Sequence, residues 1–149
     1  MEIKQMDKKG LDFLILEEGI KLKPYLDFAN VPTIGVGCTY YEDGTRVKMT
    51  DPAITRERAE SLFKNVLKNY ETTVWSVTRD DISQNQFNAL VSICFNIGVN
   101  GFKGSTLLKR VNANPNDPNI TEAFKMWRNS AGKPILLGRR IREAKLYFS

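Results

Sequence analysis

The sequence contains no histidine, and this absence excludes several kinds of enzyme chemistry. Ser-His and Cys-His nucleophilic pairs both need an imidazole as the base. The histidine-rich zinc sites of many hydrolases are excluded for the same reason. Carboxylate chemistry remains available, because the chain carries 17 Asp and Glu residues.

Cysteines and long apolar runs are also scarce. A disulfide between Cys38 and Cys94 is compatible with the count, but Cys94 lies in an apolar segment, so we expect two free thiols. No apolar run approaches the roughly 18 residues of a membrane span. The N-terminal residues MEIKQMDKKG lack the apolar region of a signal peptide. We therefore expect a protein that is made and kept in a cytoplasm, without stable membrane insertion.

The remaining composition is that of one globular domain. The 149 residues are 42% hydrophobic and 26% charged, and the net charge is +5. A chain of this length buries about two thirds of its unfolded surface. We find no Lys/Arg run interleaved with aromatic residues, which argues against a nucleic-acid partner. The positive charge favours attraction to some other polyanion.

A short amphipathic helix is predicted near the N-terminus, and it ends on an acidic residue. Its apolar face repeats at helical spacing through Leu11, Leu14, Ile15 and Glu18. Gly19 then indicates the helix end. We expect Glu18, rather than the adjacent Glu17, to be functional because Glu18 completes this face. The helix C-terminus and partial burial both disfavour a negative charge, as a general acid requires.

A second acid follows in a different environment. Pro24 ends any helical continuation, and Asp27 precedes the turn-rich segment FANVP. We therefore expect Asp27 to be more solvated than Glu18 and to stay ionised. Thr33 opens the segment TIGVG, which is predicted as a strand with close backbone approach at its glycines. Two carboxyls in opposed environments are suited to act as an acid and a base.

The spacing Glu18-x8-Asp27-x5-Thr33 resembles the catalytic triad of the phage-type lysozymes, or endolysins. The flanking words LKPYLD and TIGVG, the central segment QNQFNALVSICFNIGVNGFKGSTLL, and the C-terminal segments FKMWRNSAGK and GRRIREAKLY resemble the same family. The resemblance covers nearly the whole chain. It implies an α+β, lysozyme-like fold with no metal and no cofactor.

The family resemblance also implies an activity. A muramidase of this kind hydrolyses the β-1,4 bond from N-acetylmuramic acid to N-acetylglucosamine in peptidoglycan. Glu18 would protonate the leaving oxygen, Asp27 would act as the base, and Thr33 would help to hold the attacking water. An inverting outcome is implied, which requires carboxyl groups roughly 6.5–9.5 Å apart.

The partner implied is the glycan strand of a bacterial wall, whose peptides carry carboxylates and so suit the basic chain. We expect a monomer that waits in the host bacterial cytoplasm until a separate protein permeabilises the membrane, and then acts on the cell wall.

Further family positions are expected to line the cleft and touch the glycan: Thr39, Phe95, Asn96 and Ser105. Each of three has a simpler interpretation, because Phe95 suits core packing, Asn96 a helix end and Ser105 a helix cap. Asp43 is explained fully by its place in an Asp-Gly turn.

The family resemblance implies two further features. Arg139, Arg140 and Arg142 match the family's arginine-rich helix, and the sequence leaves open which of them approaches Glu18; a solvated cationic face is the alternative. Cys38 stands where the family most often has histidine. We expect it to be a small packing residue, because no base is available to activate a nucleophilic thiolate.

Two other activities stay open at this point. A lytic transglycosylase cuts the same bond with one acid and leaves an anhydro sugar, so it has no need of Asp27 and Thr33. An inactive wall-binding module would not need the triad.

The expected architecture is one domain over residues 1–149. A small lobe, about 12–55, contains a hairpin at Tyr40–Val47, so that Thr33 to about Met49 forms a small antiparallel sheet. A connecting helix, about 55–78, begins at the N-cap Thr55. The helical lobe, about 79–149, has five expected features: a buried helix opened by a capping box at residues 83–86 and stopped by Gly98, a loop VNGFKG, a helix beginning at Ser105 or Thr106, a helix capped by Thr121 and a last helix over about 137–148.

Overall fold

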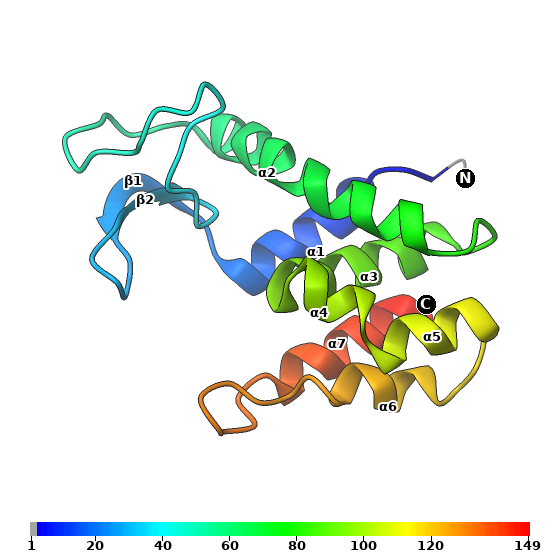
Figure 1. Cartoon of the computed structure of the whole chain (residues 1–149). Helices are drawn as coiled ribbons and strands as arrows, with labels where there is room; N and C mark the ends of the chain where they lie inside the picture. The colour runs from blue at the N-terminus through cyan, green and yellow to red at the C-terminus, as the bar shows by residue number, and fades with distance from the viewer. Residues whose placement is uncertain (1–2) are drawn as a thin grey trace. The chain divides into compact units, whose positions relative to one another are not determined.

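The computed structural model describes residues 3–149 (Figure 1). Within that range, helices dominate and the strands form one two-stranded antiparallel sheet. The elements in chain order are α1 (Lys8–Glu18), β1 (Lys21–Leu26), β2 (Pro32–Gly35), α2 (Arg56–Val77), α3 (Gln84–Ile97), α4 (Val99–Lys103), α5 (Thr106–Ala113), α6 (Ile120–Lys125) and α7 (Leu137–Tyr147). No helix of residues 3–149 is both long and apolar enough to cross a membrane.

The chain divides into two compact units. The N-terminal unit is Asp12–Lys68, and the C-terminal unit combines the residues up to Leu11 with Asn69–Ser149. The boundaries fall within α1 and within α2, so each of these helices belongs partly to both units.

The sheet of the N-terminal unit is a hairpin. β1 and β2 pair antiparallel, with Tyr25 opposite Thr33 and Leu26 opposite Pro32. β1 was not predicted from the sequence, because Pro24 was interpreted only as a helix breaker. Proline is tolerated in a strand at a sheet edge, and both strands of a two-stranded sheet are edges.

The predicted sheet from Thr33 to Met49 is wrong in its extent. β2 ends at Gly35, and beyond it the chain forms only isolated bridges, such as Tyr40 with Arg46. Gly35 and Gly37 both have φ of +67°, a left-handed conformation that interrupts an extended strand. The Asp-Gly turn at residues 43 and 44 is confirmed, with φ of +87° at the glycine.

A small core holds the N-terminal unit together. Its buried members come from β2, the following loop and α2: Ile34, Cys38, Val47 and Leu62. The loop also covers the free edge of β1, since Ile54 N–H donates to the carbonyl of Leu22 at 2.9 Å. The hairpin is therefore attached to the unit along β1 as well as through β2.

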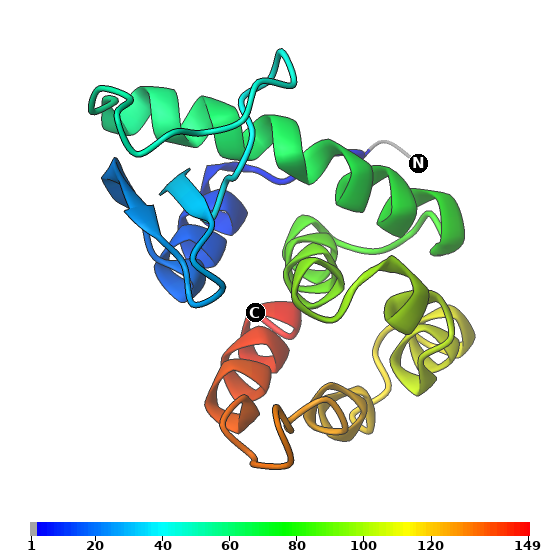
Figure 2. The same ribbon diagram turned by 60° about the vertical axis from the view of Figure 1, so that its left-hand side comes forward.

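The C-terminal unit is built around α3. Figure 2 looks nearly along α3 and shows the yellow, orange and red helices α5, α6 and α7 arranged around it. α3 packs against α7 and α4, and α6 packs against α5 and α7. The predicted capping box is confirmed, because Ser83 and Gln86 each satisfy the other's backbone N–H. Gly98 ends the helix as predicted.

Other helix predictions have mixed outcomes. The connecting helix and the last helix are confirmed as α2 and α7, and Thr55 Oγ1 accepts from Arg58 N–H at 3.0 Å, as an N-cap does. The segment VNGFKG is not a loop, because residues 99–103 form α4. Thr121 does not cap α6, because that helix already begins at Ile120. Both errors concern single-turn or two-turn helices, whose sequence signals are short.

The close approach of α1 and α3 depends on Gly10, and we predict that Gly10→Ala destabilises the fold. An added Cβ would lie 2.4 Å from Cγ of Asn88, which is fully buried and donates to Asp7 Oδ1 at 2.8 Å. Overpacking of this kind costs about 2 kcal/mol of unfolding free energy, which outweighs the gain in helix propensity. Urea denaturation measures it.

Gly104→Ala is the matched control, because the nearest atom to its added Cβ is a backbone carbonyl oxygen at 3.7 Å and its φ is −91°. Its unfolding free energy should stay within about 0.5 kcal/mol of the parent. Equal stability of the two variants would show that Asn88 moves aside without cost.

Candidate functional site

The three residues of the predicted triad all belong to the N-terminal unit. Glu18 is the last residue of α1, Asp27 directly follows β1, and Thr33 lies in β2. Gly19, with φ of +84°, donates its N–H to the carbonyl of Ile15 at 2.8 Å and ends α1 as predicted. One compact unit of 57 residues, Asp12–Lys68, therefore contains both candidate acids and the candidate hydroxyl.

The environment of Glu18 differs from the prediction. Leu11, Leu14 and Ile15 are buried as expected, but Glu18 is exposed and Glu17 is half-buried. The helical phase is as predicted, yet α1 ends at Glu18, so its carboxyl lies beyond the last residue of the buried stripe. Partial burial therefore does not distinguish Glu18 from Glu17. Glu18 differs from Glu17 in being the last residue of the helix.

Asp27 organises the turn that joins β1 to β2. Its Oδ1 accepts hydrogen bonds from the N–H groups of Ala29, at 2.8 Å, and Val31, at 3.0 Å. Its backbone carbonyl accepts from Asn30 N–H at 2.9 Å, where the chain takes a φ of +62°. The half-buried Asp27 is thus held in place by the backbone of its own turn. Both side-chain bonds fall on Oδ1, so the turn itself leaves Oδ2 unused.

Thr33 is buried, and its hydroxyl also bonds to this turn. Oγ1 donates to the carbonyl of Val31 at 2.8 Å. Val31 therefore connects the two candidate groups, because its N–H binds Asp27 and its carbonyl binds Thr33. A hydroxyl whose single proton is already donated can only accept a further hydrogen bond. Any water molecule at Thr33 Oγ1 must therefore be the donor.

Tyr25 is a neighbour of this site that the sequence analysis did not single out. It lies opposite Thr33 in the sheet, and Lys21 Nζ lies over its ring, 4.3 Å from the ring centroid. The pKa of the Tyr25 hydroxyl is raised above its ordinary value, chiefly by burial. The charge of Asp27 and, to a smaller extent, that of Cys38 raise it further. The alternation of Tyr25 and Asp27 in LKPYLD would have indicated this proximity if β1 had been recognised as a strand.

The two cysteines are free thiols, as predicted, and both are buried. Cys38 donates to the carbonyl of Val36 at a sulfur-to-oxygen distance of 3.7 Å and belongs to the core of the N-terminal unit. Burial raises the pKa of the Cys38 thiol to about 11, so the reactive thiolate is scarce at neutral pH. Its environment is that of a packing residue.

The predicted substrate-binding residue Thr39 is half-buried, and its carbonyl accepts from Val47 N–H at 3.0 Å.

The other predicted substrate-binding residues lie in the C-terminal unit. Phe95 is half-buried near the end of α3, and its ring meets that of Tyr70 edge-on at 5.1 Å between centroids. Ser105 is buried and caps α5, since it accepts from Leu108 N–H at 3.0 Å. Ser105 also donates to a backbone carbonyl at 2.7 Å, so the hydroxyl has a structural function. Its contact with glycan stays a prediction.

Asn96 is exposed, and a buried ionic cluster holds its side chain. Arg140 donates from Nη2 to Asn96 Oδ1. Arg140 Nη1 lies 3.1 Å from Glu143 Oε1, while Arg139 Nε donates to Glu143 Oε2 at 3.2 Å. Ser92 donates its hydroxyl to the same carboxylate. The alternative of a solvated cationic face is therefore wrong for Arg139 and Arg140, which are both buried, whereas Arg142 is exposed.

The electrostatics of this cluster have two opposing contributions. Burial raises the pKa of the Glu143 carboxyl above its ordinary value, while Arg140, Ser92 and Arg139 act to lower it. A buried carboxylate is stable only with such partners. The cluster therefore ties α7 to α3 and fixes the orientation of the Asn96 amide. Among residues 3–149, no group of His, Cys, Asp and Glu side chains is arranged to hold a metal ion.

Comparison with known proteins gives consistent results. A sequence model of the family described as phage lysozyme matches residues 16–143. The chain is 40% identical over 146 residues to the endolysin of Salmonella phage P22, which covers 97% of this chain and 99% of that protein. It is 30% identical to the endolysin of Bacillus phage B103 over 97% of this chain, but spans about half, 54%, of that protein's length.

The structural comparison agrees with the sequence comparison. The crystal structure of a variant of P22 lysozyme superposes with a TM-score of 0.91 and 39% sequence identity. The superposition covers 99% of this chain and 100% of the other. The predicted lysozyme-like α+β fold is therefore confirmed.

Proposed function

This chain belongs to the phage lysozyme family of glycoside hydrolases, and we propose that it is an endolysin that hydrolyses the β-1,4 bond between N-acetylmuramic acid and N-acetylglucosamine in bacterial peptidoglycan. The observation that carries this proposal is the turn at residues 27–33. There the backbone of Val31 binds the Asp27 carboxylate through its N–H and the Thr33 hydroxyl through its carbonyl. A carboxylate and an accepting hydroxyl are thus tied to one peptide segment.

Asp27 and Thr33 are suited to hold the attacking water. Thr33 Oγ1 has donated its proton to Val31, so it accepts one proton of the water in a hydrogen bond. Asp27 Oδ2, which the turn does not use, accepts the other. A water molecule that donates both protons presents its lone pair to the anomeric carbon. As the carbon–oxygen bond forms, Asp27 takes the proton as the general base.

Glu18 is the proposed general acid. The leaving sugar oxygen needs a proton as the glycosidic bond breaks, and Glu18 is the other triad carboxyl in the N-terminal unit. The net charge of +5 favours approach to a wall whose peptides carry carboxylates.

The turn also argues against a lytic transglycosylase. That reaction uses a hydroxyl of the muramic acid itself as the nucleophile, so it does not need an enzyme-held water. Storage in the host cytoplasm, release to the wall at lysis and action as a monomer belong to the same proposal, and they rest on the family resemblance.

We predict that Glu18→Gln lowers turnover of purified walls by about 100-fold or more, because the amide cannot donate the required proton. Glu17→Gln is the matched control, since it makes the same change one residue away on the same helix, and its activity should stay within a factor of a few of the parent. Wall clearing measures activity, and circular dichroism establishes that both variants are folded. Equal losses in the two folded variants would refute the assignment of the acid.

We predict that Asp27→Asn loses at least about 100-fold in turnover while its melting temperature stays close to that of the parent. The asparagine Oδ1 still accepts from Ala29 and Val31, so the turn is preserved, but the amide neither takes a proton nor carries a negative charge. Asp27→Ala, which also removes the turn bonds, should lose both activity and stability. Substantial activity in Asp27→Asn would contradict a base at this position.

A further inference from the structure

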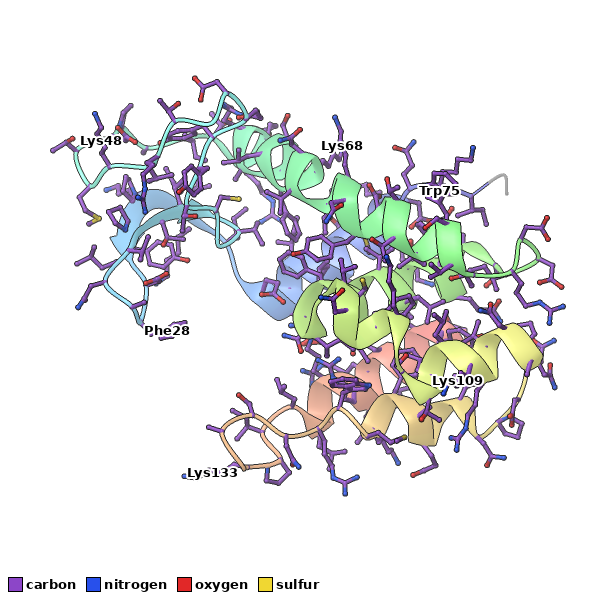
Figure 3. The ribbon with its side chains drawn as sticks, viewed as in Figure 1. Phe28, Lys48, Lys68, Trp75, Lys109 and Lys133 are labelled. Atoms are coloured by element: carbon purple, nitrogen blue, oxygen red, sulfur yellow. The ribbon has the colours of Figure 1, made fainter. Side chains whose placement is uncertain are left out.

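One aromatic side chain beside the proposed base is left without a role by this mechanism. Phe28 immediately follows Asp27, and its exposed fraction, 103%, is the highest among the exposed large hydrophobic residues of the described chain. Figure 3 shows Phe28 at the tip of the turn between β1 and β2, pointing away from the ribbon. A ring in this position adds nothing to the hydrophobic core, so it does not contribute to folding through burial.

The turn holds the backbone that carries this ring in a defined place. The peptide groups on both sides of Phe28 are hydrogen-bonded, because the Asp27 carbonyl accepts from Asn30 N–H and Ala29 N–H donates to Asp27 Oδ1. The carboxylate that is proposed to activate water therefore also anchors the backbone that carries Phe28. A ligand that contacts the ring does so without first ordering a loose loop, which favours binding.

Two leucines of β1 are also exposed. The exposed fraction is 38% at Leu22 and 50% at Leu26, but Pro24 between them is half-buried, so the two side chains do not form a continuous patch with Phe28. Single exposed apolar residues are ordinary on protein surfaces, so the inference depends on the full exposure of Phe28 and on its place next to Asp27 in the turn.

We propose that Phe28 is a specificity-determining residue that stacks its ring on a sugar ring of the glycan strand, next to the bond that is cut. This rests on the proposed function of Asp27. A β-linked pyranose presents axial C–H groups on its faces, and these carry a small positive charge. The face of a phenyl ring is negative, so the two surfaces are complementary in both polarity and shape. The occupant is the sugar rather than the stem peptide, because Phe28 is adjacent to the group that acts on the glycosidic bond.

The kinetic test compares Phe28→Ala with Phe28→Tyr and Phe28→Leu on soluble, uncrosslinked peptidoglycan fragments. Phe28→Ala should raise KM by about 10-fold with kcat nearly unchanged, since a contact made equally in ground and transition states affects KM alone. Phe28→Tyr should keep the parent KM within about twofold, because the aromatic face is retained. Phe28→Leu should raise KM nearly as much as Phe28→Ala does, because leucine has no aromatic face. All three variants should have the melting temperature of the parent, because the Phe28 side chain is exposed.

Met49→Ala is the control for loss of an exposed apolar side chain in the same unit. Met49 is 47% exposed, and its neighbour Lys48 lies well away from Phe28 (Figure 3). It should keep the parent kinetics. An unchanged KM in Phe28→Ala, or full rescue by Phe28→Leu, would overturn the stacking proposal.

A binding measurement separates this proposal from the function on which it rests. Glu18→Gln holds the fragment uncut, and ring-current shifts in its NMR spectrum identify the protons that lie over the phenyl face. Upfield shifts of pyranose ring protons, lost in the Glu18→Gln/Phe28→Leu double variant, are the expected result. Ring-current shifts confined to stem-peptide protons, or the absence of any such shift, would reject the stacking of Phe28 on a sugar ring. Failure of the parent enzyme to release reducing sugar would instead reject the proposed function, whatever the NMR result.

Discussion

The hydrogen bonds between Asp27 and its own turn are the interaction on which the proposed site depends. Oδ1 binds the N–H groups of Ala29 and Val31, and the Val31 carbonyl in turn receives the Thr33 hydroxyl. The same turn sets the register of β1 against β2 and fixes the backbone of Phe28. One side chain thus has a structural function beside the chemical function proposed for it, and substitution by asparagine separates the two.

The sequence predicted the long helices and their ends well, because their signals are repeated over several turns. Ser83 with Gln86, Gly98 and Thr55 each act as the capping chemistry requires. β1 was missed because its six residues contain a proline and show little alternation in burial. The exposure of Glu18 was missed for another reason: helical periodicity gives the direction of a side chain but not where the packing beneath it ends.

The sequence proposed a set of residues for the candidate site, but the hydrogen bonds among them could not be predicted. The family spacing and the apolar face of the first helix proposed Glu18, Asp27 and Thr33, whereas the connection through Val31 is a backbone contact that no side-chain pattern reports. The Arg140 contact to Asn96 joins residues 44 positions apart, and no pattern in the sequence indicated that Arg139 and Arg140 would be buried against Glu143. Such contacts depend on the packing of α3 against α7.

The central claim is that a water held by Asp27 and Thr33 attacks the anomeric carbon. Digestion of purified walls in ¹⁸O-labelled water, followed by mass spectrometry of the released fragments, tests it most directly. The account predicts one ¹⁸O atom for each bond cut, at the newly formed reducing end of the muramic acid. Fragments that end mainly in anhydro-muramic acid and carry no label would contradict it, because the sugar's own hydroxyl would then be the nucleophile.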